Sequence, residues 1–147
     1  MDDHTFSQLV MDCERKLYRI AHTLLRTDAD CQDAMQEAIL RAWSKRKSLR
    51  EVHYFDTWLI RILINECRNI QRDAAKVPAI APEPPPADTQ ALYDALMALS
   101  EKYRLITELH YIEGYEVSEI AAMLKIPGGT VKWRLSKARS LLKEALS

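Results

Sequence analysis

Hydrophobic residues recur at intervals of three and four along most of the chain, which is the period of an amphipathic α-helix. Three such stripes occupy the first half. Their members are Phe6, Leu9, Val10, Cys13, Leu17, Ile20 and Leu24 in the first stripe, Cys31, Met35, Ala38 and Ala42 in the second, and Phe55, Trp58, Leu59, Ile62, Leu63 and Ile70 in the third. Thr27 or Asp28 precedes the second stripe, and either side chain suits a helix N-cap. The pattern predicts three helices.

The second half continues the same pattern. Glycine, the usual turn former, occurs only at Gly114, Gly128 and Gly129, so strands and tight hairpins have little support. The apolar spacing there predicts four more helices, at about 89–99, 101–112, 116–124 and 129–145.

The segment between the two halves differs in composition. Residues 76–90 hold five of the six prolines, which remove backbone donors and favour an extended conformation. We therefore predict an all-α protein of two small helical domains. The first covers residues 1–75 and the second residues 90–147, each near the lower size limit for an independent fold. A Pro-rich linker, 76–89, joins them.

The distribution of charge along the chain is informative, whereas the net charge is not. Lys and Arg number 21, and so do Asp and Glu, so the chain as a whole carries no basic signal for nucleic acid. Residues 125–143 nevertheless contain six basic residues and no acidic one, and residues 41–50 contain five basic residues and no acidic one. Two local basic segments are therefore the candidates for contact with a polyanion.

Other chemistry is sparse. The three cysteines form no CxxC motif and lie among apolar neighbours, which is typical of buried, reduced thiols. The four histidines are far apart and join no metal or nucleophile motif, so we predict no catalytic residue, no metal site, no cofactor and no enzymatic activity. The N-terminus lacks a basic segment followed by an apolar one, and no apolar run approaches a membrane span. These features favour a cytoplasmic protein that does not insert into membranes.

The segment VSEIAAMLKIPGGTVKWRL has the spacing of a helix-turn-helix, in which the second helix lies in the major groove of DNA. Small Ala121 on the first helix allows a close crossing. Val131, Leu135, Ala138 and Leu142 give the last helix one buried face, which turns its basic side chains outward. Lys and Arg attract phosphates, and side chains that reach base edges supply sequence preference. A basic face that is merely solvated is the alternative.

A family resemblance covers nearly the whole chain. The segments LLRTDADCQDAMQEAILRAW and YFDTWLIRILINECRN resemble the sigma-2 domain of the bacterial sigma-70 superfamily, in its extracytoplasmic-function group. The segment LMALSEKYRLITELHYIEGYEVSEIAAMLKIPGGTVKWRLSKARSLLKEAL resembles the sigma-4 domain. The resemblance implies a promoter-specificity subunit that directs core RNA polymerase to promoters, stabilises melted minus-10 DNA and catalyses no covalent step.

The resemblance also implies sites and partners. The partners are core polymerase, through its β′ clamp helices and β flap, promoter DNA and an inhibitory anti-sigma factor. The residues expected to bind core polymerase are Asp33, Gln36, Glu37, Leu40 and Arg41. Those expected to capture a flipped base and hold the minus-10 strand are Lys47, Arg50, His53, Tyr54, Arg61, Asn65, Asn69 and Arg72. Those expected to bind the minus-35 element are Thr130, Lys132, Trp133, Arg134, Ser136, Lys137 and Arg139.

Departures from the family pattern leave some points open. Asn69 stands where Asp is common, Lys125 where Gly is common and Ser100 where Pro is common. Trp133 replaces a small polar residue, so it contacts DNA or packs against a neighbouring helix or a regulator. The linker is expected to follow the path of nascent RNA, and a plain tether is the alternative. The competing function is a stand-alone helix-turn-helix regulator, which explains residues 90–147 but leaves the first domain without a role.

Overall fold

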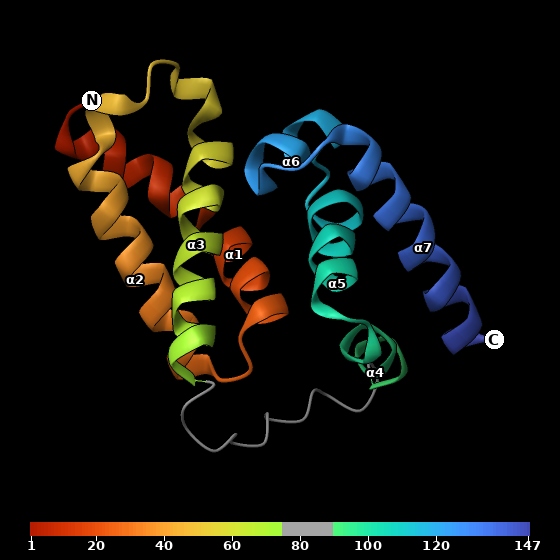
Figure 1. Cartoon of the computed structure of the whole chain (residues 1–147). Coiled ribbons are helices and arrows are strands. Elements are labelled where there is room, and N and C mark those ends of the chain that lie inside the picture. Colours follow the sequence, from red (N-terminus) through yellow and green to blue (C-terminus); the bar gives the residue numbers. More distant parts are fainter. Residues whose placement is uncertain (75–89) are drawn as a thin grey trace. The chain divides into compact units, whose positions relative to one another are not determined.

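The computed structural model describes residues 1–74 and 90–147 and divides the chain into two compact units (Figure 1). The described residues form helices and turns without a strand, so the predicted all-α class with two helical domains is confirmed. The proposed linker at 76–89 lies outside the described residues. Its form and the domain limits drawn from it therefore stay predictions.

The first unit contains three long helices, α1 (Asp3–Leu24), α2 (Asp28–Ser44) and α3 (Phe55–Ala74), each packed against the other two (Figure 1). The Asp2 carboxylate caps α1 by accepting a hydrogen bond from the Thr5 amide at 2.8 Å. The Thr27 hydroxyl caps α2 by accepting from the Asp30 amide at 3.1 Å, as the sequence predicts. Such caps satisfy amides that the first helical turn leaves without a partner.

The core of this unit is wider on α3 than the predicted stripe. Leu59 and Leu63 are fully buried as expected, but Trp58, Ile62 and Ile70 are only partly buried. A second set of α3 side chains, Ile60, Ile64 and Cys67, is fully buried instead. The reason is that α3 packs on both α1 and α2, so its buried face spans more than one helical stripe.

Polar contacts join α1 to both ends of α3. Lys16 Nζ lies 3.1 Å from a carboxylate oxygen of Asp56 in the first turn of α3. Near the other end, Gln71 Nε2 donates to the Leu24 carbonyl at 2.8 Å. This hydrogen bond satisfies a carbonyl that the last turn of α1 leaves open. The two contacts keep α3 in one position along α1.

The second unit contains α4 (Gln90–Ala98), α5 (Glu101–Thr107), the single π-helical turn η4 (Glu108–Ile112), α6 (Val117–Leu124) and α7 (Gly128–Leu146). The predicted helix at 101–112 is thus divided between α5 and η4. The wider turn accommodates the Glu113 amide, which donates to the Glu108 carbonyl at 2.9 Å. His110 Nδ1 lies 2.8 Å from the Tyr115 carbonyl, which holds the following turn at Gly114, where φ is 81°.

Helix α7 packs against α4, α5 and α6 and so organises the second unit. Ile106, Ile120 and Val131 are fully buried in its core. Arg104 is buried as well, and its guanidinium donates to the Leu99 carbonyl at 3.0 Å, beyond the end of α4. Across the described residues, no helix is both long enough and apolar enough to cross a membrane.

Candidate nucleic-acid interface

The sharp turn between α6 and α7 sets the orientation of the last helix. Lys125 ends α6 in the left-handed conformation, with φ 56° and ψ 47°, and the next amide, of Ile126, donates back to the Ala121 carbonyl at 3.1 Å. A capping box between Glu116 and Glu119 secures the start of α6. These local features produce the helix-turn-helix geometry that the sequence predicts.

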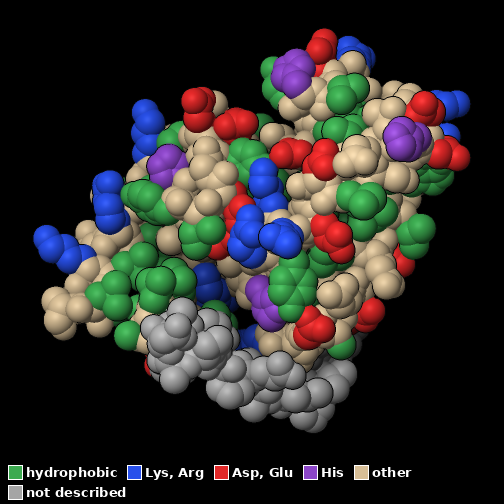
Figure 2. Space-filling model, turned by 180° about the vertical axis from the view of Figure 1, so that it is seen from behind, with side chains coloured by type: hydrophobic (Ala, Val, Ile, Leu, Met, Phe, Trp, Pro, Cys, Tyr) green, Lys and Arg blue, Asp and Glu red, His purple; other side chains and the backbone are tan. Residues whose placement is uncertain are grey.

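Helix α7 buries one face and exposes the other. Val131, Leu135 and Ala138 are buried, as predicted. The expected DNA-binding residues occupy the remaining surface: Lys132, Trp133, Ser136, Lys137 and Arg139 are exposed, and Thr130 and Arg134 are partly exposed. Figure 2 shows several separate Lys and Arg side chains on the side of the second unit where α7 lies, at the left in that view. The exposed face of α7 therefore carries several basic side chains together with Trp133 and Ser136.

The beginning of α7 differs from the expectation in one detail. Two adjacent glycines before Thr130 lead us to expect amides open to a phosphate at this helix start, but the Thr130 amide itself donates to the Pro127 carbonyl at 3.0 Å. The open amides are therefore those of Gly128 and Gly129. A side chain at Gly129 would meet no atom of the described residues within 4 Å, so packing inside the unit does not require glycine there.

Trp133 is an exposed aromatic residue on the same face of α7 as the basic side chains. Its side chain is 59% exposed, and its ring centroid lies 6.3 Å from that of Tyr103 on α5, at an interplanar angle of 47°. Lys102 Nζ lies 5.1 Å from the Tyr103 ring centroid. The Trp133 ring therefore lies near Tyr103 of α5, and more than half of its surface stays available to a partner.

Helix α2 carries the residues expected to bind core polymerase. Asp33, Gln36 and Glu37 are exposed, and Leu40 is an exposed apolar side chain, 62% accessible. A helix face that presents carboxylates beside an exposed leucine suits a partner helix with both basic and apolar residues.

Arg41 is the exception among these residues, because it is already engaged. Its Nε lies 2.5 Å from a carboxylate oxygen of Glu66 on α3. The Arg41 side chain is 51% exposed, whereas that of Glu66 is 8% exposed. Sequence reasoning missed Glu66, although its place three residues after Leu63 puts it on the buried face of α3 and implies a cationic partner.

The loop between α2 and α3 contains two single-turn 3₁₀-helices, η1 (Arg46–Ser48) and η2 (Val52–Tyr54). Lys47 and Arg50 are exposed on it. The rings of His53 and Tyr54 are in contact, with centroids 4.1 Å apart at an interplanar angle of 41°, and both residues are more than half exposed. The loop thus presents three cations, Lys45, Lys47 and Arg50, the carboxylate of Glu51 and a pair of aromatic rings to solvent.

Helix α3 follows this loop directly and carries the rest of the expected minus-10 residues. Arg61, Asn65 and Arg72 are exposed on one face, and Asn69 is partly buried. The Arg72 guanidinium donates a hydrogen bond to Asn69 Oδ1. Asparagine at 69 therefore keeps the acceptor that the common aspartate would supply, without its charge.

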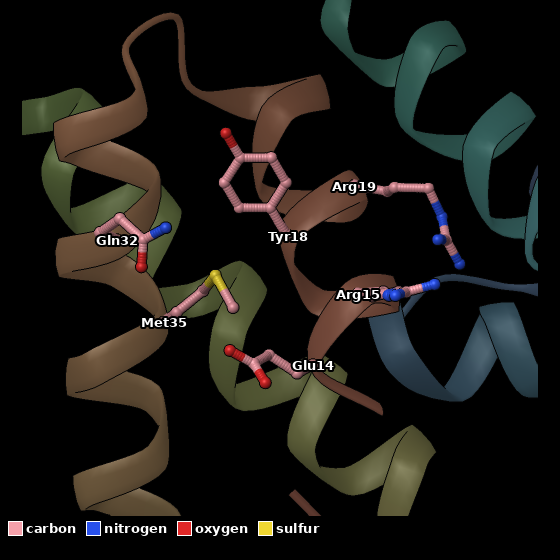
Figure 3. Close-up of a pocket in the computed structure, with 6 residues that line it drawn as sticks. All are labelled: Glu14, Arg15, Tyr18, Arg19, Gln32 and Met35. Carbon is pink, nitrogen blue, oxygen red and sulfur yellow. The ribbon is translucent and has the colours of Figure 1, made fainter. Parts of the chain in front are cut away.

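A hollow of about 440 Å³ lies elsewhere, between α1 and α2 (Figure 3). The lining residues are Glu14, Arg15, Tyr18, Arg19, Gln32 and Met35. In Figure 3 Arg15 and Arg19 extend away from the other labelled side chains. None of the residues predicted to form a site lies in this hollow. Among the described residues, no group of three or more His, Cys, Asp or Glu side chains is placed to hold a metal ion.

Comparison with known families finds two matches, in the same order as the two units. The family described as Sigma-70 region 2 matches residues 9–77, and that described as Sigma-70, region 4 matches residues 89–142. The first match contains α2, the loop and α3, and the second contains the helix-turn-helix.

Known proteins similar to the chain cover almost its entire length. The ECF RNA polymerase sigma factor SigM of Mycobacterium tuberculosis is 34% identical over 99% of this chain and 79% of its own. The ECF RNA polymerase sigma factor SigW of Bacillus subtilis is 29% identical over 99% of this chain and 90% of its own. A solved structure of the sigma factor RpoE of Bartonella quintana, in complex with the anti-sigma factor NepR, superposes with a TM-score of 0.84 at 27% identity. It covers 97% of this chain and 96% of the other.

Proposed function

The chain belongs to the extracytoplasmic-function group of the sigma-70 family, as a promoter-specificity subunit of RNA polymerase, and we propose that three of its surfaces divide that function between them. These surfaces are the outer face of α2, the loop with the exposed face of α3, and the exposed face of α7. The observation that carries the proposal is the order of the two family matches, because each match contains the helices that bear the corresponding surface.

The outer face of α2 binds the β′ clamp helices of core polymerase. Asp33, Gln36 and Glu37 supply polar contacts, and Leu40 supplies an apolar anchor that is already exposed in the free protein. Arg41 contributes its exposed half while it holds Glu66. The second unit contacts the β flap.

The loop and α3 bind the melted minus-10 element. Extracting a base from the stack costs a few kcal/mol, and an aromatic surface beside a cationic one offsets that cost. The exposed rings of His53 and Tyr54 supply the aromatic surface, and Lys47 and Arg50 supply the cations on the same loop. Arg61, Asn65, Asn69 and Arg72 then track the non-template strand along α3.

The exposed face of α7 reads the minus-35 element in the major groove. Lys132, Lys137 and Arg139 contact phosphates or base edges, with Ser136 between them. Thr130 and Arg134 lie at its margins, and the open amides of Gly128 and Gly129 approach a phosphate. Trp133 adds an apolar contact to a sugar or a thymine methyl group.

The mechanism that follows is differential binding rather than covalent chemistry. The protein acts without a cofactor, alongside polymerase in the cytoplasm, and is not an enzyme. An anti-sigma factor inhibits it by covering one or more of the three surfaces, a proposal supported by the similar sigma factor RpoE, which was solved in complex with the anti-sigma factor NepR. The alternative of a stand-alone regulator is not favoured, because it leaves the region 2 match without a role.

Transcription in vitro tests this function directly. Sigma-free core polymerase is given fragmented bacterial genomic DNA with and without the protein, and RNA 5′ ends are mapped. Defined starts that share minus-35 and minus-10 sequences are expected. If core polymerase does not bind the protein and no new starts appear, while the protein alone binds DNA, the specificity-subunit assignment fails.

Single residues separate the surfaces. Arg61→Ala with Arg72→Ala is expected to impair open-complex formation, measured by permanganate reactivity of the minus-10 thymines, while binding to core is retained. Glu37→Lys is expected to weaken binding to core by about tenfold or more, because it reverses a charge on the docking face. Unchanged transcription by either variant removes the corresponding assignment.

A further inference from the structure

Arg46, at the beginning of the loop between α2 and α3, is turned inward. Its guanidinium carbon lies 3.7 Å from the ring centroid of Trp43, which places the planar cation directly over the indole. One terminal nitrogen, Nη1, also donates to the Trp43 carbonyl at 2.8 Å. The side chain is therefore held by a stacking contact and a hydrogen bond to the same residue.

Trp43 in turn belongs to a chain of aromatic rings that reaches the other end of the loop. Its ring centroid lies 5.1 Å from that of Phe6 on α1, in an edge-to-face arrangement. Phe6 makes a second edge-to-face contact, at 5.8 Å, with Phe55, the first residue of α3. Phe6 and Phe55 are both buried. Arg46 thus anchors the start of the loop to the same cluster that holds its end.

The other cations of the loop are placed differently. Lys47 and Arg50 are exposed, whereas Arg46 is partly buried against Trp43. Two further side chains of the loop, His53 and Tyr54, immediately precede Phe55. The position of this aromatic pair therefore depends on how both ends of the loop are held.

We propose that Arg46 is a positioning residue, which fixes the conformation of the loop that receives minus-10 DNA without itself neutralising a phosphate. This inference rests on the proposed function of the loop. Preorganisation lowers the ordering cost at the moment of binding, so losing it weakens capture of the single strand while the charge of the loop stays the same.

The substitution Arg46→Lys separates positioning from charge. Lysine keeps the positive charge but has neither the planar face nor the fork of donors that the stack on Trp43 uses. Binding of the holoenzyme to a fluorescent single-stranded oligonucleotide is measured, with the non-template minus-10 segment of a promoter mapped by the transcription assay. We expect a loss of about 3- to 30-fold in affinity, the range that an aromatic contact of a cation supports.

The salt dependence of the same binding distinguishes the two roles. Removing a phosphate contact from a single strand lowers the slope of log affinity against log salt by about 0.7. Arg46→Lys is expected to leave this slope unchanged, and Arg46→Ala is expected to lose about as much affinity as Arg46→Lys, again with little change in slope. Lys47→Ala is the matched control, and it is expected to lower the slope.

A second measurement reports the loop itself. Glu51 lies within the loop, so a protease specific for glutamate cleaves there when the loop opens. The substitution at 46 neither adds nor removes a glutamate. Arg46→Lys is expected to accelerate this cleavage in the full-length protein, whereas Lys47→Ala leaves the rate near that of the wild type.

The outcomes separate this inference from the function on which it rests. If Arg46→Lys binds the oligonucleotide within twofold of wild type, the stack on Trp43 does not position the loop and the inference is overturned. If Arg46→Ala lowers the salt slope as Lys47→Ala does, Arg46 is a phosphate contact and the inference is overturned as well. If Lys47→Ala, Arg50→Ala and Tyr54→Ala all bind like wild type, the loop does not receive the strand and the proposed function of the loop fails instead.

Discussion

Replacing Arg41 with alanine is expected to destabilise the unit formed by α1, α2 and α3, because it leaves the buried carboxylate of Glu66 without its cation. The two groups are 2.5 Å apart, and the side chains are 51% and 8% exposed. An exposed ion pair contributes about 0–1 kcal/mol, whereas breaking a fully buried pair costs about 3–5 kcal/mol. Since water reaches only the arginine, we expect a loss of about 2 kcal/mol.

Replacing the partner residue, Glu66, is expected to destabilise the unit less. Glu66→Gln removes the charge that burial disfavours and leaves Arg41 hydrated, so its cost is expected to stay below about 1 kcal/mol. The double variant, Arg41→Ala with Glu66→Gln, is then expected to be more stable than Arg41→Ala alone by about 1 kcal/mol. This non-additivity is the signature of two groups in direct contact.

Urea unfolding of the full chain in a Trp133→Phe background provides the assay. The remaining tryptophans, Trp43 and Trp58, both lie in the first unit, so their fluorescence reports that unit alone. If the same variant is unfolded by heat instead, a loss of about 2 kcal/mol corresponds to a fall in Tm of about 8–16 °C for a unit of this size. Arg68→Ala, an exposed cation of α3, is the matched control. If Arg41→Ala and Arg68→Ala differ by less than about 0.5 kcal/mol, the ion pair does not support the buried carboxylate.

The backbone at Lys125, the burial of two cysteines and the exposure of Trp133 each lead to a further prediction. Lys125→Gly is expected to stabilise the second unit by about 1 kcal/mol, because it relieves a left-handed backbone with φ 56°. Urea unfolding in a background with Trp43 and Trp58 replaced by Phe follows this unit through Trp133 fluorescence, and an unchanged midpoint would contradict the strain. Burial raises the pKa of Cys13 and of Cys31 to about 12 from 9.0, so these thiols are expected to react with a thiol reagent far more slowly in the native protein than in urea. Equal labelling rates would refute the burial argument. The free energy of unfolding is expected to fall as pH rises above 9, because the unfolded chain loses its thiol protons at lower pH than the native protein. Trp133→Ser is expected to change the minus-35 sequence shared by mapped promoters while affinity for core polymerase stays the same, and an identical promoter set would remove Trp133 from the DNA contact.

Much of the architecture follows from local sequence. The three- and four-residue apolar period predicted helices in both halves, the Thr27 hydroxyl is the predicted cap of α2, and the turn before Gly128 joins the two helices of the predicted motif. These features depend on interactions within a few residues, which the order of amino acids expresses directly. The exposure of the basic face of α7 follows from the same period, since its apolar residues have only one core to face.

Contacts between segments that are distant in the sequence could not be predicted from helical periodicity. Ile60 and Ile64 are buried because α3 packs on two helices at once, and a single-helix period does not reveal how many neighbours a helix has. The pairing of Arg41 with Glu66 joins α2 to α3, so it depends on the register between them. Periodicity likewise did not reveal the π-helical turn η4 within the predicted helix 101–112.

The helical class, the two-part organisation, the family resemblance and the sets of residues that share a helix face all follow from the order of amino acids, because each is a local or patterned property of the chain. Which polar residues of those sets can meet a partner depends on how the helices pack. Arg41 and Arg46 look like the other cations between residues 41 and 50. Packing turns Arg41 toward the buried carboxylate of Glu66 and Arg46 over the indole ring of Trp43, because a buried carboxylate and an aromatic face each favour a cation as partner.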